Sequence, residues 1–488
     1  MRRHMHMGSK LKLSRVAVGM LALFVAVQVL PPFFGLHSPF GLATGLQTQN
    51  DPTACEAIGS NWTTCDNAFA SDDTYAYANN DTAGGAGSSS PVTVVDLGAE
   101  GLLHEPARHI FKNTRGNGNY YAFFRDDATN FLRYRWSADG ITWSASIDAS
   151  AIAISPGEDA GFAVDFFDEG VADGAWVTIL YQDNVPADKF AKYRRGQILD
   201  TADTITWGAE SGAGGYSKPA ERQNIQICGA ARAWMISDWK AKVAVAINTG
   251  STTVPPADFF AAHARVDWDA TAGTFSADFG CVSRDEVWAV KIDTTAGDLV
   301  AAKWTTDGST LTGPTNEASL GPSPTLTLHL ISVVINNEAT QNLEILYKDG
   351  TNLKHVRWNP TDGFGTPVTV FTGTVDSLNL AIDTTSSPNK LFAFYVKNSA
   401  NTDVSFKTTP TDTINWGTEN TIDDGGTEAL DKLSVARKDW GADSKFPLLW
   451  SRQTSFEVRF SNAAEGGGAA TPGKNDTAWK DFGFALGA

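Results

Sequence analysis

Three arginines occur in similar short segments that are far apart in the chain. They are Arg108 in PARHIF, Arg232 in AARAWM and Arg437 in VARKDW. The planar guanidinium group can hold a carboxylate through two parallel hydrogen bonds, which makes arginine a common anion ligand. If the fold brings these side chains to one axis, they form an anion-binding pocket. The alternative is that a repeated unit repeats its residues and that each arginine pairs with an acidic neighbour.

Carboxylates and one tyrosine supply the other groups that could do chemistry. Asp126 and Asp127 lie in FFRDDATN, Glu221 lies in KPAERQN, and Tyr216 precedes Ser217 in an early Gly-rich loop. Such groups act as acids, bases or nucleophiles in enzymes. For Asp126 and Asp127 the alternatives are a solvated hairpin loop and a cation site made of paired carboxylates. The His and Cys residues do not have the spacing of a zinc site, so we expect no metal and no cofactor.

The four cysteines form two candidate pairs. Cys55 and Cys65 lie close together in a polar segment, where a disulfide would close a short loop that has little core of its own. Cys228 and Cys281 each lie at the start of a strand-like run, in QICGAARA and FGCVSRDE. They can pair across neighbouring structural units, and two buried free thiols are the alternative.

The elements that must position these residues follow a repeat. After Val92, short β-runs alternate with polar turns, and no helix is expected. Residues 376–422 read as four strands joined by turns, and the segment that begins at HEPARHIFKN has the same order. Four antiparallel strands that repeat at roughly 50 to 65 residues are the signature of a β-propeller. We therefore expect an all-β propeller over residues 92–488 with seven four-stranded blades. Six blades is the alternative, because the unit at 283–318 is thin.

Polar turns are expected between the third and fourth strands of the units. Their predicted positions are 137–143, 200–207, 266–275, 302–311, 356–365 and 405–416, with a degenerate seventh that starts at 456–462. PVTVVDLG (91–98) and AWKDFGFALG (478–487) both read as outer strands. We expect one of them to close the ring beside strands from the opposite terminus, which removes an open edge.

The first of these turns, SADGITW, shows what such a turn does. Ser137 and Asp139 can bond backbone groups of the turn, and Gly140 permits a positive φ. Trp143 then begins the fourth strand and can fill the space between adjacent blades. The pattern returns in two later units, at Asp203 and Trp207 and at Asp412 and Trp416. Because a catalytic group is needed only once, recurrence indicates an architectural role.

The same turn resembles the Asp-box of the sialidase-like (BNR-repeat) propellers, although it is one residue shorter than the usual S-x-D-x-G-x-T-W. The matching residues are Ser137, Asp139, Gly140, Thr142 and Trp143. The segment before it is similar to the first blade of a sialidase, in which an Arg-Ile-Pro strand leads to the first Asp-box. The resemblance covers residues 92–488 as architecture and about 105–146 as motif.

The resemblance also implies which groups a sialidase site would need. That family holds the substrate carboxylate with three arginines and uses a Tyr nucleophile assisted by Glu, with an Asp as acid and base. Arg108 matches the arginine of the Arg-Ile-Pro strand, although His-Ile follows it here. Asp126 or Asp127 matches the loop that carries the Asp. The family's late Tyr-Ser segment is absent, so the candidates are Glu221 and, out of the family's order, Tyr216.

Residues 1–45 have the pattern of an export segment. Basic residues precede the apolar run Val16–Leu30, which fits the h-region of a signal peptide and is short for a membrane-spanning helix. An uncleaved N-terminal anchor is the alternative. Residues 46–91 are rich in Asn, Asp, Thr, Gly and Ser and are expected to form a polar linker or cap. We therefore expect a secreted or cell-surface protein.

The net charge of −17 argues against binding to a nucleic-acid backbone. We expect the propeller to recognise a glycan or another surface ligand, and this ligand can be acidic or neutral. Its central channel and top-face loops would form the site, with Arg108, Arg232 and Arg437 as ligand-binding residues. Contact with a membrane is expected only through an uncleaved N-terminal segment. The alternatives are a retaining exo-glycosidase of sialidase type and a structural cell-envelope protein, so the sequence leaves open whether the chain is an enzyme.

Overall fold

The computed structural model describes residues 69–71, 76–78, 91–96, 107–126, 128–154, 161–182, 191–211, 222–229, 231–239, 242–249, 263–268, 275–293, 297–323, 325–398, 403–425, 428–437, 445–453, 455 and 457–464. The chain divides into two compact units, Met1–Gly84 with Gly473–Ala488 and Gly85–Pro472. In the first unit, β1 (Phe69–Ser71) pairs antiparallel with β2 (Ala76–Ala78). The predicted Cys55–Cys65 disulfide and the run Val16–Leu30 lie outside the described residues. Within these stretches, no helix has the length and hydropathy to cross a membrane.

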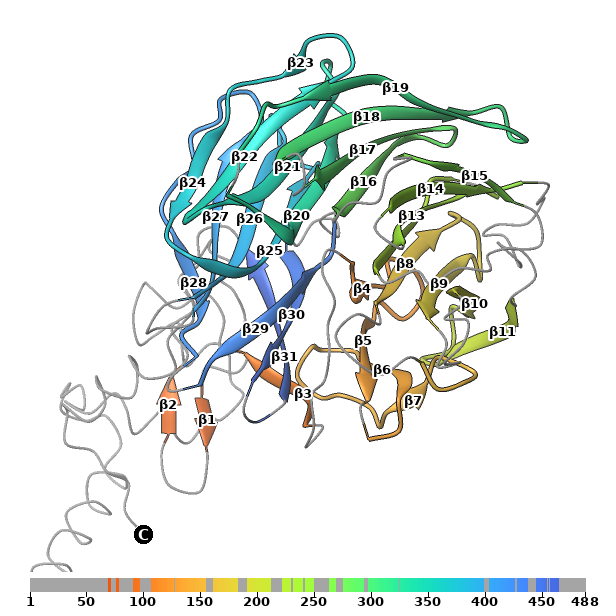
Figure 1. The fold of residues 1–488 in the computed structure, drawn as a ribbon. Helices are drawn as coiled ribbons and strands as arrows, with labels where there is room; N and C mark the ends of the chain where they lie inside the picture. The colour runs from red at the N-terminus through yellow and green to blue at the C-terminus, as the bar shows by residue number, and fades with distance from the viewer. Residues whose placement is uncertain are drawn as a thin grey trace, which may run out of the picture. The chain divides into compact units, whose positions relative to one another are not determined.

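The second unit is a ring of seven antiparallel sheets, which confirms the all-β prediction and its count of seven blades (Figure 1). Blades 1 and 2 contain β4 (Ile110–Lys112), β5 (Tyr120–Asp126), β6 (Phe131–Ser137) and β7 (Ile147–Asp148), then β8 (Phe162–Asp168), β9 (Ala175–Gln182), β10 (Ala191–Ile198) and β11 (Ile205–Ser211). Blades 3 and 4 contain β12 (Arg222–Ile227), β13 (Ala233–Trp239), β14 (Lys242–Asn248) and β15 (His263–Asp267), then β16 (Phe275–Ser283), β17 (Glu286–Asp293), β18 (Asp298–Thr306) and β19 (Leu311–Ser319).

The remaining blades include one variation and the closure of the ring. Blades 5 and 6 contain β20 (Leu326–Asn336), β21 (Asn342–Asp349), β22 (Asn352–Asn359), β23 (Gly363–Phe364) and β24 (Val368–Thr372), then β25 (Val375–Asp383), β26 (Lys390–Lys397), β27 (Val404–Pro410) and β28 (Asn420–Asp423). Blade 7 contains β29 (Leu430–Val435), β30 (Lys445–Arg452), β31 (Glu457–Ala464) and β3 (Val92–Asp96). In blade 5, the short strands β23 and β24 both pair with β22.

Strand β3 closes the ring, because it pairs with β31 and supplies the outer strand of the last blade. Val92 lies opposite Phe460 and Asp96 lies opposite Glu457. This is one of the two closing strands expected from the sequence; the other, at 478–487, lies outside the described residues. Closure by the first strand of the second unit leaves β31 without an open edge.

Two predicted third-to-fourth-strand turns are wrong. The one expected to start at 456–462 is not such a turn, because Glu457–Ala464 form β31 and the fourth strand of blade 7 is β3. The other was expected at residues 266–275, but β15 (His263–Asp267) is already the fourth strand of blade 3. Since β16 begins blade 4 at Phe275, this segment joins two blades. Turns inside a blade and connections between blades are both rich in Asp, Thr and Gly, so composition did not separate them.

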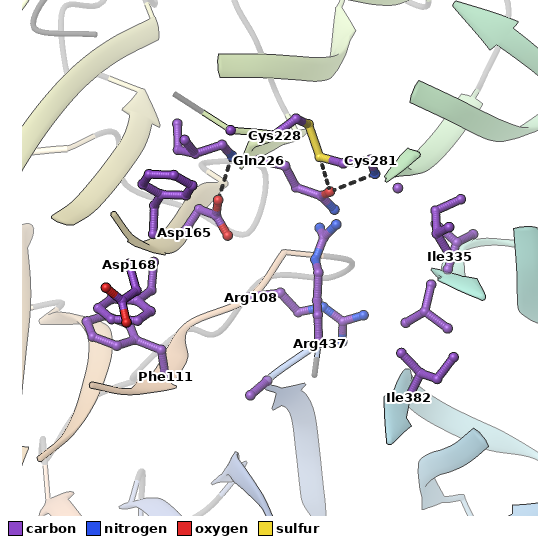
Figure 2. Close-up of a pocket in the computed structure, with 18 of the residues that line it drawn as sticks. Arg108, Phe111, Asp165, Asp168, Gln226, Cys228, Cys281, Ile335, Ile382 and Arg437 are labelled. Atoms are coloured by element: carbon purple, nitrogen blue, oxygen red, sulfur yellow. Dashed lines mark hydrogen bonds between the residues drawn. A yellow bond between two sulfur atoms is a disulfide. The ribbon is translucent and has the colours of Figure 1, made fainter. Parts of the chain in front are cut away.

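A closed ring of hydrogen bonds joins the first strands of the seven blades. At each interface a backbone N–H near or in one first strand donates to the preceding blade, and in most cases the acceptor is a side chain. The seven bonds, 2.6 to 3.1 Å long, run from Val164 N to Arg108 O, Ile227 N to Asp165 Oδ2, Cys281 N to Gln226 Oε1, Val333 N to Asp278 Oδ2, Leu380 N to Ser332 Oγ, Leu433 N to Ser377 Oγ and His109 N to Ser434 Oγ. Those at Asp165 and Gln226 are drawn in Figure 2. Polar side chains of the first strands therefore satisfy backbone donors of the neighbouring blade.

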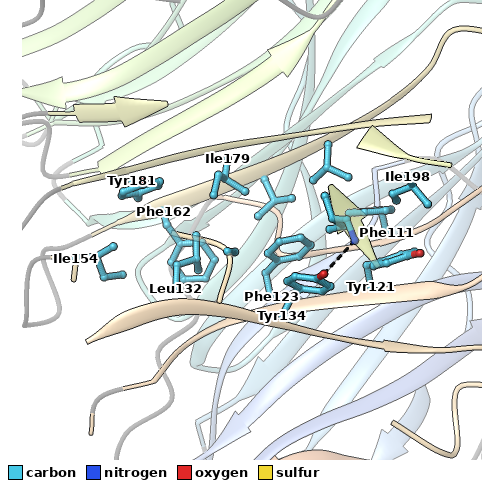
Figure 3. Close-up of a cluster of buried hydrophobic side chains, with 14 of the residues drawn as sticks. Phe111, Tyr121, Phe123, Leu132, Tyr134, Ile154, Phe162, Ile179, Tyr181 and Ile198 are labelled. Carbon is cyan, nitrogen blue, oxygen red and sulfur yellow. Dashed lines mark hydrogen bonds between the residues drawn. The ribbon is translucent and has the colours of Figure 1, made fainter. Parts of the chain in front are cut away.

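Apolar side chains fill the space between neighbouring blades. Figure 3 shows the cluster between blades 1 and 2, in which Phe123 and Tyr134 of blade 1 lie near Phe162 and Ile179 of blade 2. The Ile205 N–H of blade 2 donates to the Tyr134 hydroxyl at 3.0 Å. Each blade thus buries aromatic and β-branched residues against its neighbours, and this burial is the main source of stability for the ring.

Candidate functional site

A pocket of about 500 Å³ occupies one end of the central channel, and the innermost segments of all seven blades line it (Figure 2). Its rim includes the exposed residues Thr114, Ser283 and Asn337. Ser283 ends the first strand of its blade, and Thr114 and Asn337 lie just after first strands, in the hairpins that lead to second strands. We call the side of the propeller that carries these hairpins the hairpin face. At the inner end lies Arg108, which is only 4% exposed. The pocket therefore opens on the hairpin face, and its size is that of a small-molecule site.

Arg108 crosses the channel from blade 1 to the opposite side of the ring. Its Nη2 donates to Leu380 O and to Ser332 Oγ, both at 2.9 Å, and its Nη1 donates to Val435 O at 3.3 Å. Burial lowers the pKa of Arg108 to about 9, the charge of Arg437 lowers it as well, and Asp278 acts in the opposite direction. The side chain ties blade 1 to blades 5, 6 and 7 and ends the pocket.

Arg437 reaches from blade 7 to blade 4. Its Nη1 donates to Phe279 O at 2.9 Å, and its Nη2 lies 3.5 Å from Oδ1 of the buried Asp278. The Nε and Nη2 atoms of Arg437 are buried without a hydrogen-bond partner in the described part of the chain. With 14% of its side chain exposed, Arg437 is more accessible to the pocket than Arg108. The charge of the buried Asp278 thus acts on both guanidinium groups.

The two walls of the pocket differ in character, as Figure 2 shows. On one side lie Asp165 and Asp168, and on the other lie Ile335 and Ile382. Burial tends to raise the pKa of Asp168, but hydrogen bonds from the Gly170 N–H and the Arg115 side chain outweigh it, so the pKa is lowered. Charged donors, carboxylate acceptors and an apolar wall in one pocket suit a ligand that has both polar groups and an apolar face.

A disulfide between Cys228 and Cys281 forms part of the pocket wall and joins blades 3 and 4, with Cα atoms 5.6 Å apart. This confirms the predicted pairing across neighbouring units and rules out the free thiols. Next to it, Gln226 Nε2 donates to Phe279 O at 2.8 Å. Because Phe279 O also accepts from Arg437, the disulfide and Gln226 hold the strand that positions the Arg437 guanidinium.

Arg232 lies on the hairpin face but points away from the pocket. It belongs to the hairpin between β12 and β13, its Nη1 donates to Asn248 O, and its Nε donates to Asp285 Oδ1 at 3.3 Å. Arg232 therefore has the acidic neighbour that the alternative interpretation expected. Of the three arginines singled out from the sequence, the structure brings together Arg108 and Arg437.

The candidate acid Asp126 lies at the other end of its blade. It ends β5, where the hairpin to β6 begins, whereas the pocket-lining Thr114 lies in the hairpin before β5. Its Oδ2 forms an ion pair with Arg133 Nη1 at 2.6 Å, and its Oδ1 accepts from Ala128 N at 3.0 Å. These contacts are those of a hairpin residue. The other three candidates, Asp127, Tyr216 and Glu221, lie outside the described residues.

Two Tyr–Glu pairs are present, and both lie within blades. Tyr181 donates to Glu210 of the same blade, and Tyr395 donates to Glu419 at 2.5 Å. Burial raises the pKa of both tyrosines, and each Glu raises it further, which keeps the phenols protonated. Among the described residues, those that line the pocket include no Tyr and no Glu. In these stretches there is also no group of three His, Cys, Asp or Glu placed to hold a metal ion.

The turn at 137–143 is held by its own side chains. Asp139 Oδ1 accepts from Ile141 N at 2.7 Å and from Thr142 N at 2.8 Å, and these bonds lower its pKa. The Ser137 hydroxyl donates to Asp139 and accepts from Gly140 N at 2.8 Å, while Gly140 has φ of +75°. A turn of this kind fixes the path of a hairpin and presents no group to the pocket.

The tryptophans that follow these turns pack against the preceding blade. Ring centroids lie 5.1 Å apart for Trp143 and Phe460, 6.3 Å for Trp207 and Tyr134, and 5.4 Å for Trp416 and His355. Asp203 also bonds to the preceding blade, because it accepts from Asn119 Nδ2 at 2.9 Å, while Asp412 is exposed. The structure therefore places these residues between blades, as the interpretation of Trp143 expected, and away from the channel.

Three polar residues that build the channel were not expected from the sequence, namely Asp165, Gln226 and Asp278. Asp278 accepts from Asn224 Nδ2 at 2.5 Å and from Phe279 N at 2.8 Å, in addition to its bond from Val333 N. The available signal was a polar residue with apolar neighbours within a first strand, such as Asp165 in FAVDFFD. Such a residue is costly to bury unless it is bonded, which marks it as part of a network.

No protein-family model and no curated protein matches the chain. Among solved structures, an ulvan lyase, a polysaccharide lyase bound to -[GlcA(1-4)Rha3S]-, has a TM-score of 0.51 at 12% identity, with 79% of this chain and 99% of that chain covered. AofleA from Arthrobotrys oligospora has a TM-score of 0.44 at 11% identity, covering 70% and 92%. A six-bladed fungal lectin from Aleuria aurantia has a TM-score of 0.41 at 12% identity, covering 68% and 98%. At such identities a likeness speaks for fold alone, and by fold the chain is a β-propeller.

Proposed function

We propose that this propeller binds a saccharide that carries an acidic group, and that the acid faces Arg437 and Arg108 in the channel pocket. The observation that carries the proposal is the pair of guanidinium groups at the inner end of one pocket, where the charge of one buried carboxylate acts on both. An incoming carboxylate or sulfate would be attracted by the positive charge of Arg437, whose side chain is 14% exposed and whose Nη2 already lies 3.5 Å from Asp278 Oδ1. It would also offset the repulsion between the two arginines.

A saccharide as the ligand is supported by the walls of the pocket. Ile335 and Ile382 offer an apolar surface to the CH groups of a sugar ring, while Asp165 and Asp168 offer acceptors for its hydroxyls. The ulvan lyase with the same fold was solved with a saccharide that contains GlcA, an acidic sugar. Export is part of the proposal, since the Cys228–Cys281 disulfide and the apolar run near the N-terminus are both typical of exported proteins.

Binding is favoured over hydrolysis of sialidase type. That reaction needs a Tyr nucleophile with its Glu beside the arginines, but the two described Tyr–Glu pairs are intra-blade contacts away from the pocket. Asp126, the candidate acid, is held by Arg133 at the far end of its blade from the hairpin face. The observations therefore support a recognition module.

The test compares the full chain with Arg437→Gln on a glycan array, followed by calorimetry with the best acidic saccharide. We expect the variant to lose about tenfold or more in affinity, because a charge-assisted contact is removed. Arg437→Lys keeps the charge without the planar fork and is expected to fall between the two. Melting curves of each variant check that it is folded.

Arg232→Gln is the matched control, since Arg232 lies on the same face and has an ion pair but does not line the pocket. It should bind as the unchanged chain does. Equal affinity of the unchanged chain and Arg437→Gln would contradict the proposal. Turnover of a fluorogenic sialoside would contradict the choice of binding over hydrolysis.

A further inference from the structure

We propose that the pocket is blind and takes only the end of a saccharide chain: a terminal acidic unit enters with its acid first, and an acidic unit inside a chain is excluded. The inference rests on the proposed function and adds which part of the saccharide is read. Three features of the channel carry it, namely its closed inner end, the packed layer behind that end, and its opening on the hairpin face.

The inner end is closed by a side chain that is fixed in place. Arg108 spans from blade 1 to the carbonyl of Leu380, the hydroxyl of Ser332 and the carbonyl of Val435. These three acceptors lie on three different blades, so the guanidinium group bridges the channel from one side to the other. Opening this end would break all of these hydrogen bonds and leave buried polar groups without partners, which is costly.

Behind Arg108 the channel is filled. The first-strand residues on that side include Asn224, Ser377, Asn379 and Ser434, each of which is at most 1% exposed. They bond to one another's strands; for example, Asn379 Nδ2 donates to Leu433 O at 2.8 Å, and Ser434 accepts from His109 N at 2.8 Å. None of the four lines the pocket. A polymer therefore has no path from the pocket through this layer.

In the described part of the chain, the pocket opens on the hairpin face. Thr114, Ser283 and Asn337 at the rim are exposed, whereas Arg108 at the inner end is 4% exposed. A terminal unit can bring its acid to Arg437 while the rest of the chain leaves through the rim. A sugar unit inside a chain has a neighbouring sugar on each side. If its acid lay at Arg437, the second neighbouring sugar would need the space that Arg108 or the surrounding first strands occupy.

The experiment uses three acidic sugars, glucuronate, galacturonate and N-acetylneuraminate, and measures binding to the full chain by calorimetry. Each sugar is offered free, at the non-reducing end of an oligosaccharide, and in the same oligosaccharide with a neutral hexose added to that end. We expect the end-presented form of at least one acid to bind, and its capped form to bind about tenfold or more weakly. The free sugar should compete with the end-presented form, because it fills the same blind pocket.

A rim variant separates the pocket from the rest of the surface. Asn337→Trp places a large side chain at the mouth without changing either arginine, and it should weaken the end-presented ligand. Val171→Trp is its matched control, since Val171 lies in the β8–β9 hairpin, is 54% exposed and does not line the pocket. It should leave binding unchanged, and melting curves confirm that both variants are folded.

The outcomes distinguish this inference from the proposed function. If capped and end-presented forms bind equally, the blind pocket is overturned while acidic-saccharide binding stands. If the unchanged chain binds none of these forms and no acidic saccharide on the glycan array, the proposed function fails and this inference fails with it. If Asn337→Trp binds as well as Val171→Trp, the ligand does not enter through the rim, and the inference is overturned.

Discussion

At Gly140 and Gly170 the backbone has nearly the same conformation, with φ of +75° and +81°, but the surroundings differ. A Cβ at Gly140 would lie 2.7 Å from Cε1 of Phe460 in blade 7, whereas a Cβ at Gly170 would meet nothing within 4 Å. We expect Gly170→Ala to lower the free energy of unfolding by about 1 kcal/mol through backbone strain. Gly140→Ala should lose about 1–3 kcal/mol more through overpacking. Denaturant unfolding measures both, and equal losses would contradict a role for this turn in blade packing.

Arg108 predicts a pH dependence of ligand binding. Because burial lowers its pKa to about 9, the group is charged below pH 9 and loses its charge above it in the folded protein. Affinity for an acidic saccharide should therefore fall as the pH rises through about 9. The unfolded chain keeps this proton to a higher pH than the folded chain, so above about pH 9 this group makes the free energy of unfolding rise with pH. Calorimetry from neutral pH to pH 10 checks the fall in affinity, which should be absent in Arg108→Gln.

The arginines also show what sequence can and cannot predict at this scale. The segments around Arg108 and Arg437 correctly indicated side chains in the channel. Arg232 has a similar segment but belongs to a hairpin, where its guanidinium turns to Asn248 and Asp285. Side-chain direction depends on the turn geometry and on partners more than 15 residues away, so spacing alone did not predict it.

Among the elements, the first strands of blades 3 and 4 are clamped by the Cys228–Cys281 disulfide. Replacing both cysteines by serine should lower the free energy of unfolding by about 2–4 kcal/mol. It should also weaken the acidic ligand, because β16 carries Phe279, whose carbonyl holds Arg437. Unfolding and binding are measured with and without reductant. Reductant should weaken ligand binding by the unchanged chain and should not change ligand binding by the double variant. Unaltered binding by the double variant would contradict a positioning role for the disulfide.

The elements explain why most of the fold was predictable and one blade was not obvious. Runs such as KLFAFYVK, which is β26, bury both faces between blades and are recognisable as strands. Blade 4 looked thin because its first strand, FSADFGCVS, faces the channel and therefore contains Asp278, Gly280 and Cys281 among its apolar residues. The turn at 266–275 was misplaced for a related reason, since polar connections look alike inside and between blades.

For the whole molecule, the ring of inter-blade hydrogen bonds makes each blade depend on the next. Ser377 accepts from Leu433 N between blades 6 and 7, and Ser434 accepts from His109 N between blades 7 and 1. The second link lies where β3 also completes blade 7, so two separate contacts close the circle. The ring is closed by pairs of residues that lie far apart in the sequence. The sequence repeat predicted the spacing of the blades, but it did not predict which residues pair.

Ser377→Ala and Ser434→Ala each remove one link and leave a buried N–H without its acceptor, so each should lower the free energy of unfolding by about 1–3 kcal/mol. Ser319→Ala, on the exposed face of β19, should change it by less than about 0.5 kcal/mol. Ser332→Ala differs from the first two, because Ser332 Oγ accepts from Arg108 as well as from Leu380 N. It should lower both stability and affinity for the acidic ligand, whereas Ser377→Ala and Ser434→Ala should lower stability alone. Denaturant unfolding and calorimetry on the four variants test this, and a Ser332→Ala chain with unchanged affinity would show that the ring does not hold Arg108 in its binding position.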